Sequence, residues 1–258
     1  MNSQRQPRRP LSRRHFLTRV AVVGAAASAP GLLAGPAHAV PTPPPWPGRR
    51  AEPPEVRRLR ERHAKTLTGR TSTNGWELEK VADDHGSIYT RPVTGTRLDG
   101  VQVRVGEVEV VLVHLIRRFH YEVDELRQGE VVGWRPPGKV DGRLPESALA
   151  SGTAVRIRPG HCPVGTSGNL RPLELAVVRD VLAELEGVVR WGGDDPSPDE
   201  SLFFIDVPPG DGRLTEVADR IRGWRSRAGR GAGAPVDVAS PDRRRAAKAM
   251  ELRQRTVR

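Results

Sequence analysis

The sequence predicts a mixed α+β domain that lies between flexible N- and C-terminal extensions. Apolar residues recur at helical spacing over 108–126 and again over 173–185. The segments Thr153–Ile157 and Leu202–Val207 have the alternation or the residue types of strands. Outside residues 71–225 the composition becomes rich in Pro or in Gly and Arg, so the domain is predicted to occupy that range.

The N-terminus has the features of an export signal. Ser12–Thr18 contains a pair of Arg, Val20–Leu33 is apolar, and Ala37–Ala39 offers a small-residue cleavage site. Residues 1–39 are therefore predicted to be a twin-arginine signal peptide that directs the chain to the cell wall or the exterior. The alternative is a short anchor helix, but the apolar run is broken by proline and shorter than the ~20 residues that span a bilayer. Cleavage would leave no transmembrane anchor.

The net charge of +11 is concentrated at the two ends of the chain. Residues 1–39 contain six Arg and no acidic residue, and residues 225–258 contain ten basic and three acidic residues. The middle is nearly neutral, which gives no support to a nucleic-acid-binding domain. Residues 226–258 are predicted to be a solvated basic tail, with attraction to anionic wall polymers or lipid headgroups as an alternative. The abundance of Arg, Ala, Gly and Pro over Lys is typical of high-GC actinobacterial proteins.

The remaining elements follow from local pattern. Residues 40–70 read as a Pro-rich linker that ends in a marginal helix. Further strands and a last helix are predicted at Ile88–Thr90, Val101–Val105, Val188–Trp191 and Leu214–Trp224. The chain has one cysteine, Cys162, so no internal disulfide can form.

Two separated motifs give the clearest functional signal. The first, Ser147–Arg156, has the form Ser-x-Leu-x-x-Gly-x-Ala-x-Arg, and the second, Asp199–Phe203, begins with Asp-Glu-Ser-Leu. They resemble the Ser-x-His-x-x-Gly-x-Ala-x-Asp and acidic-x-x-His signatures of the zinc D-alanyl-D-alanine carboxypeptidases. The resemblance extends over roughly Thr71 to Trp224. It implies an α+β domain with a central antiparallel sheet flanked by helices and a cleft.

The same resemblance argues against the chemistry of that family. At its three ligand positions this chain has Leu149, Arg156 and Leu202. Leu offers no lone pair and the guanidinium is always charged, so no zinc cofactor is expected. Asp199 occupies the general-base position, but no metal-bound water would be present for it to act on. The sequence therefore predicts a non-catalytic, peptidase-like domain.

Several alternatives concern what the former active site now does. Arg156, together with Ser147, Glu200 and His161, is a candidate binding site for the free carboxylate of a peptidoglycan stem peptide. Arg156 could instead pair with Asp199 or Glu200 and plug the site.

A residual peptidase remains a further hypothesis. It would rely on Asp199, on a relocated metal held by residues such as His161 and His114, or on a Cys162–His161 nucleophile. Because neighbours on a strand face opposite sides, adjacency does not support that nucleophile. A third class is an exported protein that binds an envelope partner through its two ends.

Overall fold

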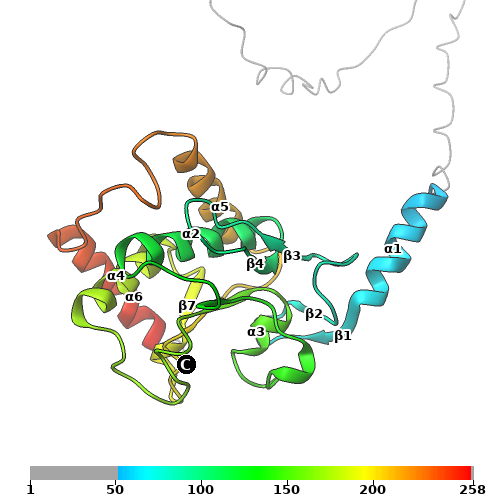
Figure 1. Cartoon of the computed structure of the whole chain (residues 1–258), viewed down its shortest axis with the longest axis horizontal. Coiled ribbons are helices and arrows are strands. Elements are labelled where there is room, and N and C mark those ends of the chain that lie inside the picture. The colour runs from blue at the N-terminus through cyan, green and yellow to red at the C-terminus, as the bar shows by residue number, and fades with distance from the viewer. Residues whose placement is uncertain (1–51, 257–258) are drawn as a thin grey trace, which may run out of the picture. The chain divides into compact units, whose positions relative to one another are not determined.

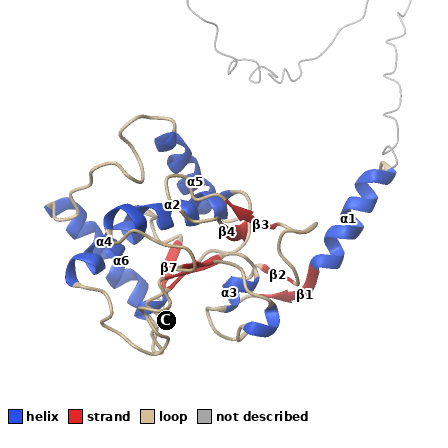
Figure 2. Cartoon of the chain, viewed as in Figure 1, coloured by secondary structure: helices blue, strands red, loops and turns tan. Residues whose placement is uncertain are grey.

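The computed structural model describes residues 52–256, with only the backbone at Thr256. The predicted signal peptide and the first part of the Pro-rich linker lie outside the described residues. Within them the chain forms six α-helices and three antiparallel sheets, which confirms the α+β prediction (Figures 1 and 2). The helices are α1 (Pro54–Thr66), α2 (Glu107–Glu122), α3 (Ser147–Ala150), α4 (Pro172–Glu184), α5 (Gly212–Arg225) and α6 (Pro241–Thr256).

The largest sheet has four strands in the order β5-β6-β8-β7, and all neighbours are antiparallel. Its strands are β5 (Val131–Val132), β6 (Ala154–Ile157), β7 (Val189–Trp191) and β8 (Leu202–Ile205). Two hairpin-like pairs accompany it, formed by β1 (Leu67–Thr71) with β2 (Glu77–Glu79) and by β3 (Ile88–Arg91) with β4 (Val101–Arg104). The strands β1, β2 and β5 were not predicted. β1 lies largely in the range assigned to the linker and its marginal helix, and β2 and β5 have only three and two residues.

Alternation along the strands divides the large sheet into two faces. Val155 and Phe203 belong to the main core, together with apolar residues of α2 and α4. Ala154 and Leu202 belong to a smaller cluster with residues of α3. Since successive side chains of a strand point to opposite faces, Arg156 lies on the α3 side with Ala154. This alternation determines which face carries the site.

The main core is built around α2. Its predicted apolar stripe is buried, and the helix is covered so widely that nearly all of its apolar side chains are in contact with other elements. It packs mainly against α5, α4 and β4. Gly106 precedes the helix, which ends after Glu122, earlier than the periodicity indicated, while Leu126 is still buried in the loop that follows.

The glycine of the first motif, Gly152, has a backbone conformation that requires this residue type. Its φ is +67°, a conformation that residues with a Cβ rarely adopt. A Cβ at this position would also lie 2.9 Å from the backbone nitrogen of Arg104, which donates to the Gly152 carbonyl. The turn between α3 and β6 therefore requires glycine and ties this motif to β4.

The C-terminal segment differs from the expected solvated tail. Pro241–Thr256 forms α6, which lies beside α4 (Figure 1). Arg243 binds Asp180 of α4, and Met250 is buried in the main core. The Gln254 side-chain amide donates to the Val189 carbonyl over 2.8 Å. These long-range contacts, which composition does not reveal, hold the basic segment on the domain.

The N-terminal part of the described chain contains the predicted marginal helix as α1, most of whose residues are exposed. The turn after β1 is attached more firmly, because the Trp76 indole donates to the Val207 carbonyl and the Asn74 amide donates to the Ile205 carbonyl. None of the helices in residues 52–256 combines the length and apolar character needed to cross a membrane.

Candidate functional site

The two motifs meet at a pocket of about 340 Å³ on the α3 side of the large sheet. We call it the motif pocket. It is lined by residues before α3, on β6, in the loops at 164 and 195–199, and at the start of β8. These are Leu144, Pro145, Glu146, Arg156, Val164, Asp195, Pro196, Ser197, Asp199 and Leu202.

Arg156 is held between two carboxylates at this pocket. Its Nε donates to Oδ2 of Asp199 over 3.0 Å, and its Nη2 donates to Oε2 of Glu146 over 2.7 Å. Nη2 also lies 2.9 Å from the same Asp199 oxygen. The guanidinium therefore supplies positive charge between two acids, while the pocket remains open beside it.

The other two positions that align with ligands of the resembling peptidases, Leu149 and Leu202, provide apolar surface. Leu202 is the cross-strand partner of Arg156, and both line the motif pocket. Leu149 lies in α3, is fully buried and packs in the same small cluster as Leu202. The structure thus brings all three positions to one face of the sheet. No zinc fits these residues, because two hydrocarbon side chains and a guanidinium provide no lone pair for a metal.

Both oxygens of Asp199 are engaged by protein groups. Oδ1 accepts from the backbone nitrogen and the hydroxyl of Ser201, at 3.2 and 2.5 Å, and Oδ2 accepts from Arg156. The turn that carries Asp199 depends on Gly192, where a Cβ would lie 2.7 Å from the Asp199 carbonyl oxygen. Asp199 therefore acts in this geometry as an anchored partner of Arg156.

Glu146 is a site residue that sequence reasoning missed. It precedes the first motif directly, and its Oε1 accepts from the backbone nitrogen of Asp141 over 2.7 Å. That hydrogen bond fixes the carboxylate, while Oε2 contacts Arg156. Its position next to Ser147 was the only signal in the sequence that could have suggested it.

The rim of the motif pocket is apolar, which the sequence also did not reveal. Leu144 and Val164 are 50% and 62% exposed and stand at its edge with Pro145 and Pro196. An open pocket with apolar walls and a few charged groups at its floor is typical of sites for small ligands or short peptide segments.

Three candidate residues are placed elsewhere. Ser147 is fully buried and its hydroxyl accepts from the Thr73 backbone nitrogen over 3.0 Å. Glu200 accepts from the backbone nitrogens of Gly168 and Asn169, so it orders that loop and does not contact Arg156. His161 is exposed and is not among the residues that line the motif pocket. The expected grouping of these three around Arg156 is therefore not what the structure shows.

The residues proposed for a relocated metal or a nucleophile also lie apart. His114 is buried on α2, where its Nε2 is 2.7 Å from Glu184. Cys162 is buried, and this burial, with Glu200 nearby, raises the pKa of its thiol to about 11. A thiol of that pKa is a weak nucleophile near neutral pH. Among the described residues, no three His, Cys, Asp or Glu side chains form a group that could hold a metal.

Comparisons of the chain with models of known families, with curated proteins and with solved structures found no match. The interpretation of the motif pocket therefore relies on its own residues.

Proposed function

We propose that the described part of this chain is a non-catalytic, peptidase-like domain that binds a short peptide in the motif pocket. The observation that carries the proposal is the position of Arg156, held by Asp199 and Glu146 where the resembling peptidases place a metal ligand. The convergence of Leu149 and Leu202 on the same face supports the resemblance to the zinc D-alanyl-D-alanine carboxypeptidases.

The apolar rim and one guanidinium suggest how a peptide would be held. Arg156 is the one cation in a lining that also contains the carboxylates of Glu146, Asp195 and Asp199. The apolar rim at Leu144 and Val164 would cover an aliphatic side chain, since burying one contributes about 1.5–3 kcal/mol. Nη1 of Arg156 is left as a donor for a carboxylate, because Nε and Nη2 are used by the two acids. This supports one hydrogen bond to a peptide C-terminus and not the forked contact first expected. With the predicted export signal, peptidoglycan stem peptides are the proposed ligands, and an envelope protein is the alternative.

The proposal is tested by titrating the full chain with a stem pentapeptide and following heat release. Val164→Asp places a charge on the apolar rim, and we expect it to weaken binding about tenfold, equivalent to about 1.4 kcal/mol. Leu173→Asp is the matched control, because Leu173 is similarly exposed at 67% and does not line the motif pocket. Equal loss in both variants, or no binding by the unmodified chain, would contradict the proposal. A C-terminally amidated pentapeptide tests the Arg156 contact separately.

A further inference from the structure

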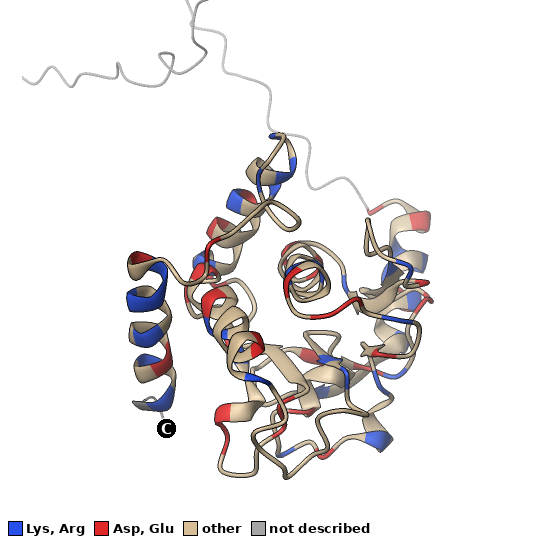
Figure 3. Ribbon diagram, turned by 60° about the vertical axis from the view of Figure 1, so that its left-hand side comes forward, with Lys and Arg blue, Asp and Glu red and all other residues tan. Residues whose placement is uncertain are grey.

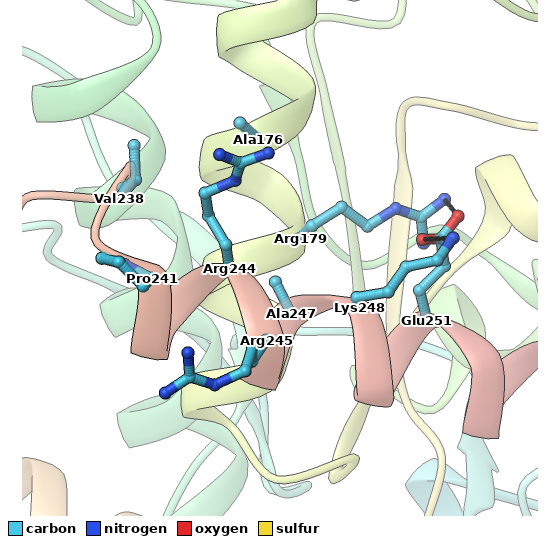
Figure 4. A pocket seen from close by; sticks show the side chains of 9 residues that line it. All are labelled: Ala176, Arg179, Val238, Pro241, Arg244, Arg245, Ala247, Lys248 and Glu251. Carbon is cyan, nitrogen blue, oxygen red and sulfur yellow. Dashed lines mark hydrogen bonds and ion pairs between the residues drawn. The ribbon is translucent and has the colours of Figure 1, made fainter.

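A second concave site lies between α4 and α6, and it shares no lining residue with the motif pocket. We call it the α4–α6 groove, and its volume is about 530 Å³. The residues that define it are Ala176, Arg179, Arg244, Ala247, Lys248 and Glu251 (Figure 4). It exists only because the basic C-terminal segment is folded against α4.

Positive charge prevails in this groove. Arg179, Arg244, Arg245 and Lys248 line it together with a single acid, Glu251. Arg244 and Lys248 are four residues apart, so they lie on one face of α6. Figure 3 shows the resulting bands of basic residues along the helix that ends at the C-terminus.

The cations differ in how far they are neutralised by protein groups. Arg179 makes two contacts to Asp194, and Lys248 lies 3.0 Å from Glu251. Arg244 has no ion-pair partner among the described carboxylates, and its side chain extends past Ala176 (Figure 4). Lys248 is 62% exposed and its pairing with Glu251 is correspondingly weak. Arg244 and Lys248 are thus two cations on one face of α6 that an external anion can reach. Arg245 also lines the groove, is 74% exposed and is paired with Asp242, which is itself 87% exposed.

The shape of the groove favours an extended anion. Its floor includes the methyl groups of Ala176 and Ala247, which leave room along the two helices. Pro241 closes one end, where the N-terminus of α6 adds partial positive charge. The volume exceeds that of one phosphate, so several groups of a chain fit along it. Arg and Lys are the residues that proteins use to bind phosphate oxygens.

Two other anionic partners, a single-stranded nucleic acid and a lipid membrane, fit the groove less well. No Phe, Tyr or Trp lines the α4–α6 groove, so it offers no platform on which bases could stack. Insertion into a membrane requires an extended outward apolar face. On α6, Met250 is buried in the main core and Ala247 lies in the groove, which leaves Leu252, 54% exposed, as the one large exposed apolar side chain of its described residues. We infer that this groove binds a phosphodiester polymer without aromatic bases, of the polyol- or sugar-phosphate class. The inference does not depend on the proposed function of the motif pocket.

The test uses the full chain and a fluorescent glycerol-phosphate oligomer, with binding followed by polarisation at several salt concentrations. The variant Arg244→Gln with Lys248→Gln removes the two exposed cations that share one face of α6. We expect about tenfold weaker binding. The slope of log affinity against log salt concentration should also decrease in magnitude by about one to two, because two phosphate contacts are lost. The matched control, Arg57→Gln with Arg58→Gln, removes the same charge from exposed positions on α1 and should change affinity less than about twofold.

Three results would overturn the inference. The first is absence of binding by the unmodified chain, and the second is an equal loss in the α1 control, which would show attraction by net charge alone. The third is tighter binding to oligothymidylate or to phosphatidylglycerol vesicles, which would assign the groove to nucleic acid or to a membrane. Thermal unfolding of each variant confirms that a lost affinity is not lost folding. Stem peptides are absent from this assay. Its failure would therefore not bear on the motif-pocket experiment, and the two proposals can fail separately.

Discussion

Arg156 and Leu202 are cross-strand partners on β6 and β8, and their side chains line the same pocket. In the resembling peptidases these two positions would carry an acid and a histidine that share a metal. Here a guanidinium occupies one position and a hydrocarbon chain the other, so the charge on Asp199 is balanced by Arg156. If the resemblance holds, the guanidinium of Arg156 stands where those peptidases hold a metal ion.

Removing that cation should destabilise the fold. Arg156→Leu would leave the carboxylates of Asp199 and Glu146, both largely buried, close together without the cation between them. We expect a loss of about 2 kcal/mol in the free energy of unfolding, measured with urea, which is below the range for fully buried pairs because the site is partly solvated. The triple variant Glu146→Gln, Arg156→Leu, Asp199→Asn should recover at least half of the loss. Unchanged stability of Arg156→Leu would show that the ion pairs are not structural.

Introducing the ligand types of the resembling peptidases should create a metal site. Because Leu149, Arg156 and Leu202 lie on one face, the variant Leu149→His, Arg156→Asp, Leu202→His presents three donors to one region. We expect one zinc per chain and a higher unfolding temperature with zinc than without it. The double variant Leu149→His, Leu202→His retains the Arg156 cation and should bind none. A folded triple variant without zinc would contradict the resemblance.

The ion-pair network between α2, α4 and α6 should control acid stability. Burial alone would raise the pKa of Glu184, but the hydrogen bond from His114 and the charge of Arg118 lower it to about 2. A carboxyl whose folded pKa lies below its unfolded value of about 4.3 stabilises the protein above that value. This stability is lost as the pH falls from about 5 to about 2.

Glu184→Gln should therefore lower the free energy of unfolding at neutral pH by about 2 kcal/mol and flatten its decline in acid, as measured by urea titration at several pH values. Burial also lowers the pKa of His114. As the pH falls, the unfolded chain therefore binds a proton at this histidine before the folded chain does, and the free energy of unfolding begins to decrease below about pH 6.5. Glu186→Gln, which alters a carboxylate that is 59% exposed, is the control and should leave the acid limb unchanged. An identical acid limb in both variants would contradict this role of Glu184.

Cys162 should be inert in the folded protein. With its thiol pKa raised to about 11, little thiolate is present at about pH 8, and the side chain is also buried. A chromogenic thiol reagent should modify it far more slowly in buffer than in concentrated urea. Equally rapid modification in both conditions would reopen the hypothesis of a nucleophilic cysteine.

Local pattern was enough to predict several of the elements that build the site. The alternation in 153–157 placed Arg156 and Ala154 on one face, and the stripe in 108–126 predicted α2 as a core helix. A pairing of Arg156 with Asp199 was one of the alternatives that the two motifs raised, because both are charged and belong to the same candidate site.

Long-range contacts account for what the sequence could not show. Glu146 reaches Arg156 only because α3 packs over β6, and no spacing rule identifies such a contact. The basic tail has a composition typical of solvated segments, yet Arg243 donates to Asp180 and Gln254 donates to the edge strand β7. In the sequence, polar residues that contact specific partners far along the chain cannot be distinguished from polar residues that face solvent.

The most direct test of the central claim is the zinc content of the unmodified full chain after zinc loading and desalting, measured by elemental analysis. With Leu149, Arg156 and Leu202 at the ligand positions, we expect close to no zinc per chain. One tightly held zinc per chain would contradict the claim and would mean that other residues rebuild a metal site.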